Sequence, residues 1–320
     1  MKKIIILNPS IKDGGLSPNR GDQIISRSTE REVKILFPNA IVKSISTHNY
    51  LSFSEILEIR KADYTFVGGS NLLWFRFFPA ASWKIGLLQL LFVRRLVLLG
   101  VGWGSYELKA GIWGRFVCKI LLSKTMLHST RDAYTEQKLK DLGIHNVINT
   151  GCHTTWDYDL SSNIKDAFSE NRDIMLFTLT DYRKSKKLDQ IAIDLARNTC
   201  KDIYFWVQGS KDLEYLNSFK HNLKILDIEL IELELFIKNN VSRLVYFGTR
   251  LHCGILCMEY KVPSLIIKVD NRAEEMSKSL NLPLIDRDTI SEVKTIKPLF
   301  KTGPELILTE KILEWRKSIK

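Results

Sequence analysis

Short apolar runs alternate with longer amphipathic segments along most of the chain. In the first half, the runs predict strands at residues 4–7, 41–45, 64–67, 96–99 and 146–148. Short apolar runs separated by helical patterns are typical of parallel sheets that are covered by helices. The pattern therefore predicts an α/β protein.

The same alternation restarts after a polar stretch at residues 158–172, which we interpret as a linker. The second half predicts strands at residues 174–177, 203–207, 244–247 and 264–269, and helices at 187–197, 230–239, 251–260 and 306–319. We therefore expect two Rossmann-like domains, residues 1–157 and 158–320, with a central cleft. The last helix is assigned to the second domain.

Glycines follow three of the predicted strands. Gly68 and Gly69 follow one strand, Gly100 follows another and Gly151 a third. Since α/β folds bind ligands at the carboxyl ends of parallel strands, these loops are candidate ligand sites.

Composition narrows the class of protein. The 320 residues are 26% charged, as in ordinary globular proteins, and the net charge of +11 favours an anionic partner. The five cysteines form no CxxC pair and the six histidines have no ligand spacing, so we expect no metal site.

The apolar run at residues 4–7 is too short for a signal peptide, and Arg94 and Arg95 interrupt the apolar stretch at 86–100. A cytoplasmic location is the expectation.

The most informative stretch joins a predicted strand to a predicted helix at Thr249, Arg250 and His252. Thr249 is a candidate N-cap, and Arg272 follows the next strand. If the two strands are parallel neighbours, Arg250, His252 and Arg272 converge with a helix N-terminus on one anion. The alternative is that Arg250 pairs with a surface carboxylate and that His252 is a helix-start histidine with satisfied hydrogen bonds.

These residues also carry a family resemblance. Arg250-Leu251-His252, an apolar helix, Lys261-Val262-Pro263 and Asp270-Asn271-Arg272 resemble, in that order, the polysaccharide pyruvyl transferase family. Four earlier segments also resemble family motifs: residues 19–22 (Asn-Arg-Gly-Asp), 62–69, 100–104 and 129–132 (Ser-Thr-Arg-Asp). The chain departs from the family pattern at Ser70, Cys152 and Arg272, where the family has glycine, aspartate and lysine.

The resemblance implies a GT-B-like fold and a reaction. The family moves pyruvate from phosphoenolpyruvate onto two hydroxyls of a sugar, which yields a cyclic ketal and phosphate. It implies a donor site at Arg250, His252 and Arg272 in the second domain, with Arg131 reaching across the cleft from the first domain. His252 is the expected acid, and no cofactor is expected beside the co-substrate. Asp22 is the candidate base, although an aspartate here is also typical of a helix N-cap. For Arg131, the alternative is an ion pair with Asp132.

The acceptor is expected on the first domain. The candidate contacts there are Asn19, Gly21, Asp22, Gly68, Gly69, Ser70 and Asn71. A further expectation concerns the aromatic segment at residues 74–79, with Trp83, Arg94 and Arg95 beyond it. It predicts either contact with the inner face of the cytoplasmic membrane, where a polyprenyl-linked acceptor is found, or a buried helix pair.

Two other functions fit parts of the sequence. A nucleotide-sugar glycosyltransferase shares the two-domain layout, but Glu259 lacks a second glutamate eight residues later, where Ile267 stands. A non-catalytic basic protein that binds glycan or nucleic acid fits the charge. No nucleic-acid-binding module is present, so we expect no nucleic-acid partner.

Overall fold

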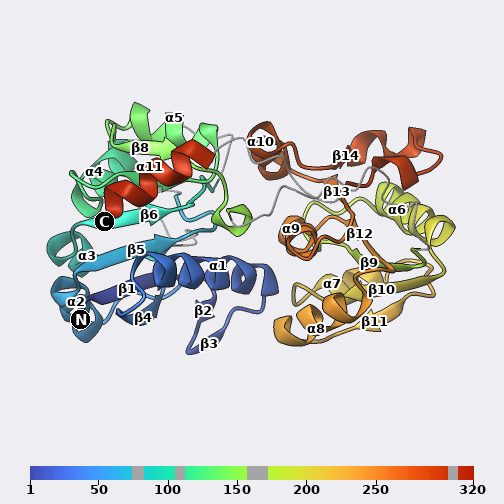
Figure 1. The fold of residues 1–320 in the computed structure, drawn as a ribbon, viewed down its shortest axis with the longest axis horizontal. Coiled ribbons are helices and arrows are strands. Elements are labelled where there is room, and N and C mark those ends of the chain that lie inside the picture. The colour runs from blue at the N-terminus through green and yellow to red at the C-terminus, as the bar shows by residue number, and fades with distance from the viewer. Residues whose placement is uncertain (74–82, 105–111, 157–171, 302–308) are drawn as a thin grey trace. The chain divides into compact units, whose positions relative to one another are not determined.

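The computed structural model describes the whole chain except residues 74–82, 105–111, 157–171 and 302–308. It divides into two compact units. Unit 1 comprises Met1–Ser17, Ile25–Trp156 and Ile307–Lys320, and unit 2 comprises Pro18–Ile24 and Asp157–Leu306. Each unit is an α/β fold built on a parallel sheet, as the sequence predicted (Figure 1). The predicted linker falls almost entirely on residues 157–171, outside the described chain.

The sheet of unit 1 has four parallel strands. In spatial order they are β4 (Ile41–Ser46), β1 (Lys3–Asn8), β5 (Tyr64–Gly68) and β6 (Leu96–Leu99). A parallel pair, β7 (His128–Thr130) and β8 (Val147–Asn149), extends beyond β6 through a bridge between Val101 and Thr130. The short strands β2 (Ile11–Lys12) and β3 (Gly15–Leu16) form a hairpin after β1.

Alternate residues of these strands face two layers of helices. Ile5 and Leu7 of β1 belong to a buried cluster with residues of the helices on one face. Those helices are α2 (Phe53–Lys61), α3 (Leu87–Phe92), α4 (Ile112–Leu121) and α5 (Ala133–Asp141). The opposite face carries α1 (Arg20–Leu36) and α11 (Thr309–Ile319) (Figure 1). Burial on both faces explains why the strands are apolar runs.

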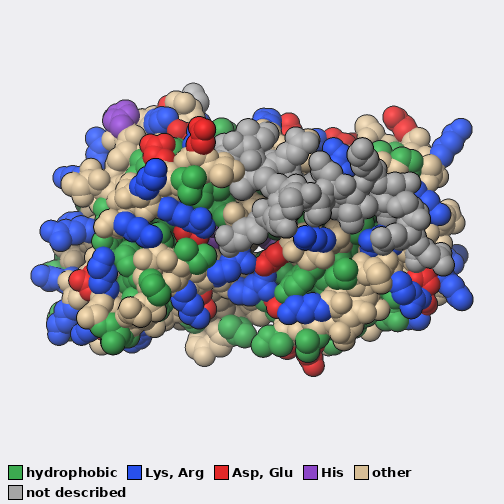
Figure 2. Space-filling view, viewed as in Figure 1, with side chains coloured by type: hydrophobic (Ala, Val, Ile, Leu, Met, Phe, Trp, Pro, Cys, Tyr) green, Lys and Arg blue, Asp and Glu red, His purple; other side chains and the backbone are tan. Residues whose placement is uncertain are grey.

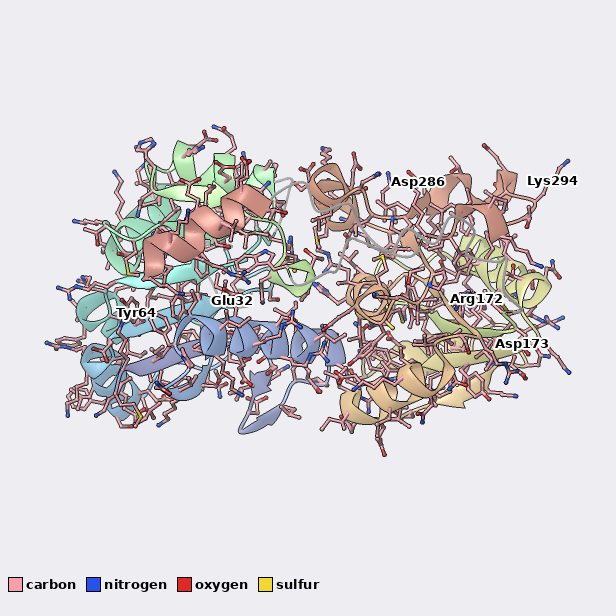
Figure 3. All side chains as sticks on the ribbon, viewed as in Figure 1. Glu32, Tyr64, Arg172, Asp173, Asp286 and Lys294 are labelled. Carbon is pink, nitrogen blue, oxygen red and sulfur yellow. The ribbon has the colours of Figure 1, made fainter. Side chains whose placement is uncertain are left out.

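The C-terminal helix α11 belongs to unit 1, which corrects the prediction that it belongs to the second domain. The Trp315 indole is fully buried, donates to the Leu127 carbonyl over 2.9 Å and packs edge-on against Phe66. Arg316 forms a two-bond ion pair with Glu32 of α1, at 2.7 and 2.6 Å (Figure 3). Order along the chain did not reveal this return because the contacts join residues far apart in sequence.

Unit 2 contains a parallel sheet of six strands. In spatial order they are β11 (Lys224–Leu226), β10 (Asp202–Trp206), β9 (Ile174–Thr178), β12 (Leu244–Gly248), β13 (Ser264–Lys268) and β14 (Leu284–Asp286). From β9 the chain first adds strands toward β11 and later adds β12 to β14 on the other side. The carboxyl ends of β9 and β12 therefore form the topological switch point, where open α/β sheets bind ligands.

Helices connect the strands of unit 2. They are α6 (Lys186–Thr199), α7 (Asp212–Leu216), α8 (Leu230–Asn240), α9 (Leu251–Glu259) and α10 (Asn271–Leu280). The described chain also has 3₁₀ turns η1 (His153–Thr155), η2 (Arg287–Glu292) and η3 (Lys297–Leu299). Arg172, just before β9, donates to the carbonyls of Val241 and Leu244 at 2.7 and 2.9 Å (Figure 3). These bonds attach the start of β9 to the region around β12.

The described residues also bear on membrane crossing and on the state of the cysteines. None of their helices combines the length and apolar character that crossing a bilayer requires. All five cysteines are buried thiols. Burial raises the pKa of the Cys200 thiol to about 12, so this thiol is held in its uncharged form.

Candidate functional site

The switch point of unit 2 is lined by residues that follow β9, β10 and β12. Thr178 ends β9 and accepts a backbone bond from Thr249 over 3.0 Å. The Thr178 hydroxyl also bonds to Tyr246 at 2.7 Å, and Tyr246 donates to the Arg250 carbonyl at 2.8 Å. These buried bonds fix the backbone at the point where the chain turns from β12 into α9.

Arg250 is the N-cap residue of α9, which corrects the prediction of Thr249. Its backbone is extended, and its side chain makes no capping bond. The guanidinium is therefore available for other partners. The positive N-terminal end of a helix dipole lies at the same place as this side chain.

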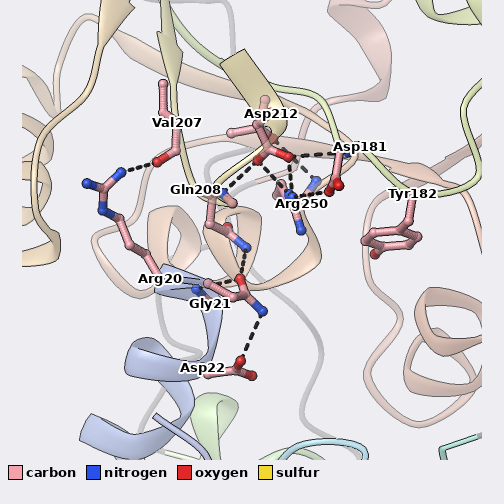
Figure 4. A network of polar contacts seen from close by, with 12 residues as sticks. Arg20, Gly21, Asp22, Asp181, Tyr182, Val207, Gln208, Asp212 and Arg250 are labelled. Atoms are coloured by element: carbon pink, nitrogen blue, oxygen red, sulfur yellow. Dashed lines mark hydrogen bonds and ion pairs between the residues drawn. The ribbon is translucent and has the colours of Figure 1, made fainter. Parts of the chain in front are cut away.

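The Arg250 guanidinium is held by two carboxylates. Its Nε donates to Asp212 over 2.9 Å, and its Nη2 pairs with Asp212 and, at 3.3 Å, with Asp181 (Figure 4). Asp212 is fully buried, and the Arg250 side chain is only 7% exposed. Among the described residues, the structure gives Nη1 no partner. Its two N–H donors are thus the edge that an anion can reach.

Asp212 is itself held by backbone donors. Its carboxylate accepts from the Gly209 N–H at 2.8 Å and from the Asp181 N–H at 3.2 Å. Burial raises the pKa of Asp212, while Arg250 and the Gly209 N–H act in the opposite direction. A Cβ on Gly209 would lie 2.3 Å from Arg250 Nη2, so a side chain at this position would force the guanidinium of Arg250 to shift.

Arg272 and Arg250 both contact Tyr182. Arg272 follows β13, the parallel neighbour of β12, and its guanidinium lies 5.1 Å from the centre of the Tyr182 ring. The Arg250 guanidinium lies 5.5 Å from the same ring. Arg272 also donates to the Tyr182 hydroxyl. The structure thus brings the two predicted arginines to one tyrosine, as expected for side chains at neighbouring strand ends.

Asp270 orients Arg272. It caps α10 through the Arg272 N–H at 2.9 Å and accepts from Arg272 Nε at 2.7 Å. Burial acts to raise the pKa of Asp270, but the charge and hydrogen bonds of Arg272 outweigh it, so this pKa is lowered. Asp270 is therefore ionised at neutral pH and holds Arg272 by its charge and by two hydrogen bonds.

The residues after β10 connect this cluster to the predicted Asn-Arg-Gly-Asp loop. Arg20 donates to the Val207 carbonyl and pairs with Asp227 and Glu229 at 2.9 and 2.8 Å. Gln208 donates to the Asn19 side chain at 3.3 Å (Figure 4). Residues 18–24 therefore belong to unit 2 by their contacts, although they precede most of unit 1 in sequence.

Within that loop, Asn19 does the capping that we considered for Asp22. The Asn19 side chain accepts from the Gly21 N–H at 3.1 Å and donates to the Asp22 carboxylate at 3.1 Å. A Cβ on Gly21 would lie 2.6 Å from the Gln208 amide nitrogen. Gly21 therefore allows the close approach of the loop to β10, and the catalytic role of Asp22 stays a prediction.

Three buried oxygens at the same strand ends have no hydrogen-bond partner in the described structure. They belong to Thr180 after β9, Gln208 after β10 and Thr249 after β12. Buried polar atoms are nearly always paired, so unpaired ones clustered at a strand edge indicate a place for a polar ligand. The sequence reasoning missed these residues, together with Asp181, Tyr182 and Asp212, because only the strand order brings them together.

His252 is the second residue of α9 and is half-buried. It follows the N-cap residue Arg250 by two positions, at the start of the helix. Its role as an acid stays a prediction.

Arg131 is buried in unit 1 and paired in the way that we weighed as its alternative. Its Nε and Nη2 lie 3.3 Å from Asp132, and its Nη1 donates to the Asn71 side chain. Only 2% of the Arg131 side chain is exposed, and Gly102 leaves the space that its guanidinium fills. Asp132 also caps α5 through Thr135, so this Arg-Asp pair joins two loops of unit 1.

The predicted acceptor loop at residues 68–71 packs on the buried side chain of His153. This side chain lies so close that a Cβ on Gly100 would be 2.3 Å from its Nδ1, and a Cβ on Gly69 would be 2.6 Å from its ring. Gly68 and Gly69 are buried, whereas Ser70 and Asn71 are half-buried. Ser70 and Asn71 are therefore the residues of this loop with exposed atoms.

The described residues hold no group of three or more His, Cys, Asp or Glu side chains that could bind a metal ion.

Comparison with known proteins identifies the family. Residues 19–271 match the family model described as polysaccharide pyruvyl transferase, which covers most of the chain. The chain belongs to the polysaccharide pyruvyl transferase family. No curated protein matches it significantly.

Solved structures with the same fold are GT-B-like enzymes. A putative UDP-N-acetylglucosamine 2-epimerase from Listeria monocytogenes is 11% identical with a TM-score of 0.54, over 99% of this chain and 96% of that one. The S. aureus MnaA–UDP co-structure is 14% identical with a TM-score of 0.52, over 98% and 95%. At these identities the likeness shows the fold alone, which is GT-B-like as predicted.

The family match begins at Asn19 and ends at Asn271. It therefore includes the loop that contacts Gln208, the Arg131–Asp132 pair and the turn at Arg250, but ends one residue before Arg272. In unit 2, residues 207–212 contact both the loop at Asn19 and the turn at Arg250 and so connect these two motifs.

Proposed function

We propose that the protein is a ketal pyruvyl transferase. It moves pyruvate from phosphoenolpyruvate onto two hydroxyls of a sugar in a cell-surface polysaccharide or its lipid-linked precursor. The observation that carries the proposal is the placement of Arg250 and Arg272 against Tyr182, beside the switch point of unit 2. Phosphoenolpyruvate is a co-substrate, and no further cofactor is proposed.

The two arginines suit this donor. Phosphoenolpyruvate carries a carboxylate and a phosphate, and guanidinium groups bind both with paired, charge-assisted hydrogen bonds. Arg250 offers its Nη1 edge, and Arg272 is the more exposed of the two, at 30%. The unpaired hydroxyls of Thr180 and Thr249 add neutral donors at the same strand ends.

The chemistry requires one acid and one base. Protonation of the donor methylene carbon makes C2 electrophilic, and a first sugar hydroxyl adds there as it loses its proton. The second hydroxyl then displaces phosphate, which leaves with the electrons of the C–O bond and takes up the proton of that hydroxyl, and the cyclic ketal closes. We assign protonation of the methylene carbon to His252 and removal of the proton from the first sugar hydroxyl to Asp22. Asn19 holds the Asp22 carboxylate in place at 3.1 Å.

The acceptor contacts are proposed at Asn19, Gly21 and Asp22 and at residues 68–71. Gly68 and Gly69 contribute by shaping the loop, since both are buried, and Ser70 and Asn71 supply polar atoms. Arg131 remains a proposed donor contact, and in unit 1 it also holds the Asn71 side chain and pairs with Asp132.

The acceptor is proposed to be polyprenyl-linked and to be met by a peripheral, cytoplasmic enzyme at the inner face of the membrane. The aromatic segment that suggested this contact, residues 74–79, lies outside the described residues. Trp83, just beyond it, is buried.

The test measures phosphate release from phosphoenolpyruvate in the presence of candidate acceptor glycans. We expect release that requires both substrates and a glycan product that has gained pyruvate as a ketal. The matched control for substitutions of Arg250 is Arg243→Gln. This change removes an exposed arginine just before β12 that pairs with Asp173. Turnover of UDP-N-acetylglucosamine with no use of phosphoenolpyruvate would overturn the proposal.

A further inference from the structure

Helix α3 in unit 1 buries its one polar residue together with Leu90 and exposes three other apolar residues. Its buried positions include Gln89, whose side chain accepts from the Gly86 N–H at 3.0 Å. Its exposed positions are Leu88, Leu91 and Phe92, and Leu91 is 55% exposed. A surface helix normally exposes its polar residues, so this arrangement indicates that another apolar phase covers the outer side of α3.

Helix α4 packs on α3 and continues this surface. It buries Gly114, Val117, Cys118 and Leu121 and presents Ile112 and Phe116 outward, at 90% and 50% exposure. Positions 112 and 116 are one helical turn apart, so the two side chains lie on the same face. We call Leu88, Leu91, Phe92, Ile112 and Phe116 the α3–α4 surface.

Cations border this surface. Arg94 and Arg95 follow α3 and are exposed, as are Arg115 and Lys119 of α4. The Arg60 guanidinium lies 5.9 Å from the centre of the Phe92 ring. Neither of the described stretches at residues 83–104 and 112–131 contains an aspartate or a glutamate. Lys and Arg side chains are spread over the visible face of the molecule in general (Figure 2). The absence of carboxylates holds for these two stretches, while the neighbouring helices carry Glu58 in α2 and Asp141 in α5, whose carbonyl accepts from Arg115.

We propose that the α3–α4 surface binds an anionic lipid bilayer. Its leucine and phenylalanine side chains enter the boundary between headgroups and acyl chains, and the bordering cations bind lipid phosphates. This inference rests on α3 and α4 alone and does not depend on the donor site in unit 2.

Charge favours a bilayer over a second copy of the chain. In a symmetric dimer the same surface meets itself, so the cations that border it in one copy would approach the cations that border it in the other. Like charges at such a contact are repulsive. An anionic bilayer instead offers opposite charge around an apolar interior.

The rest of the described chain supplies a matched control. Helix α8 of unit 2 also exposes apolar side chains, Ile231 at 75% and Leu235 at 54%. Carboxylates border them, since Glu232 and Glu234 lie on the same helix. The apolar exposure is similar, but this helix carries two carboxylates and one cation, Lys238, where α4 carries cations alone.

The experiment is flotation of the full-length protein with vesicles of equal parts phosphatidylglycerol and phosphatidylcholine, and with vesicles of phosphatidylcholine alone. We expect binding to the anionic vesicles at low salt and its loss at about 0.5 M salt. The double variant Leu91→Gln/Phe116→Gln should reduce partitioning by about tenfold or more for each residue. Arg115→Gln/Lys119→Gln should reduce it by roughly fivefold per cation.

The control Ile231→Gln/Leu235→Gln should bind like the wild type, and circular dichroism should show that all variants are folded. Three results would overturn the inference. They are wild-type protein that does not float with anionic vesicles at low salt, binding that survives the Leu91/Phe116 change, and a solution dimer that the same change dissociates. None involves phosphoenolpyruvate, so the outcome is independent of the proposed reaction.

Discussion

Arg250 and Asp212 form a buried ion pair that joins the ends of two strands not adjacent in the sheet. The Nε–carboxylate distance is 2.9 Å, and β9 lies between the strands β10 and β12 that the two residues follow. Breaking a buried pair by removing one partner leaves an uncompensated charge. We therefore regard Asp212 as the residue that positions the Arg250 guanidinium.

Asp212→Ala should lower the free energy of unfolding by about 3 kcal/mol or more, because Arg250 would stay buried without its partner. Asp202→Ala is the control, since it removes a solvent-exposed pair with Lys224 and should cost less than about 1 kcal/mol. Urea unfolding measures both. Equal effects of the two changes would show that Asp212 does not carry the buried charge of Arg250.

Gly209→Ala should weaken donor binding more than it weakens the fold. The new methyl group would lie 2.3 Å from Arg250 Nη2, so the guanidinium must move, at a strain of about 1–3 kcal/mol. Calorimetry with phosphoenolpyruvate and urea unfolding should be run on the same variant. Gly15→Ala is the control, since its nearest neighbour would be 3.9 Å away. Unchanged donor affinity in Gly209→Ala would separate Arg250 from the donor site.

His252→Gln should bind phosphoenolpyruvate like the wild type but turn over roughly 10²–10⁴ times more slowly. Glutamine can donate a hydrogen bond, but it cannot give up a proton at neutral pH. Steady-state kinetics of phosphate release separates the effect on donor binding from the effect on kcat. A variant that keeps its kcat would assign the acid to another group.

Stability should fall in mild acid because unit 1 buries two neutral histidines. Burial lowers the pKa of His128 and of His153 to about 4, whereas an unfolded histidine has a pKa of about 6.5. Between these values the unfolded state binds more protons than the folded state. Stability is therefore complete above pH of about 6.5 and decreases by about 1.4 kcal/mol per unit for each histidine as the pH falls toward 4.

Urea unfolding at a series of pH values tests this. His128 accepts from the Leu98 N–H and bonds to the Ser123 carbonyl, and glutamine can replace both bonds. His128→Gln should remove the contribution of one histidine from the pH dependence of the free energy of unfolding. His145→Gln, at an exposed position, should leave that pH dependence unchanged. Parallel curves for wild type and His128→Gln would contradict the burial of a neutral His128.

The pattern of apolar runs was sufficient to predict the α/β class and the placement of Arg250 and Arg272. These two arginines follow β12 and β13, which are consecutive in the chain and neighbours in the sheet, as consecutive strands usually are. Asp212 lies 38 residues before Arg250 and after β10. No local pattern indicates that contact, because it depends on the order of strands within the folded sheet.

The remaining differences have similar causes. The cap of α9 lies at Arg250 and not at Thr249 because backbone bonds to Thr178, a residue of another strand, set where the helix begins. Helix α11 returns to unit 1 because Trp315 fills a space beside Phe66 and Trp156. Arginine side chains are usually exposed, but Arg131 is buried because Gly102 leaves space for its guanidinium and Asp132 pairs with it.

The most direct test of the donor site is calorimetric titration of the wild-type protein and of Arg250→Lys with phosphoenolpyruvate. Lysine keeps the charge and one bond to Asp212 but loses the paired donors, so this account predicts saturable binding that weakens by about 1.5–3 kcal/mol, or roughly 10- to 150-fold, in the variant. Arg243→Lys should bind like the wild type. Wild-type protein that binds UDP-N-acetylglucosamine but not phosphoenolpyruvate, or Arg250→Lys with unchanged affinity, would contradict it.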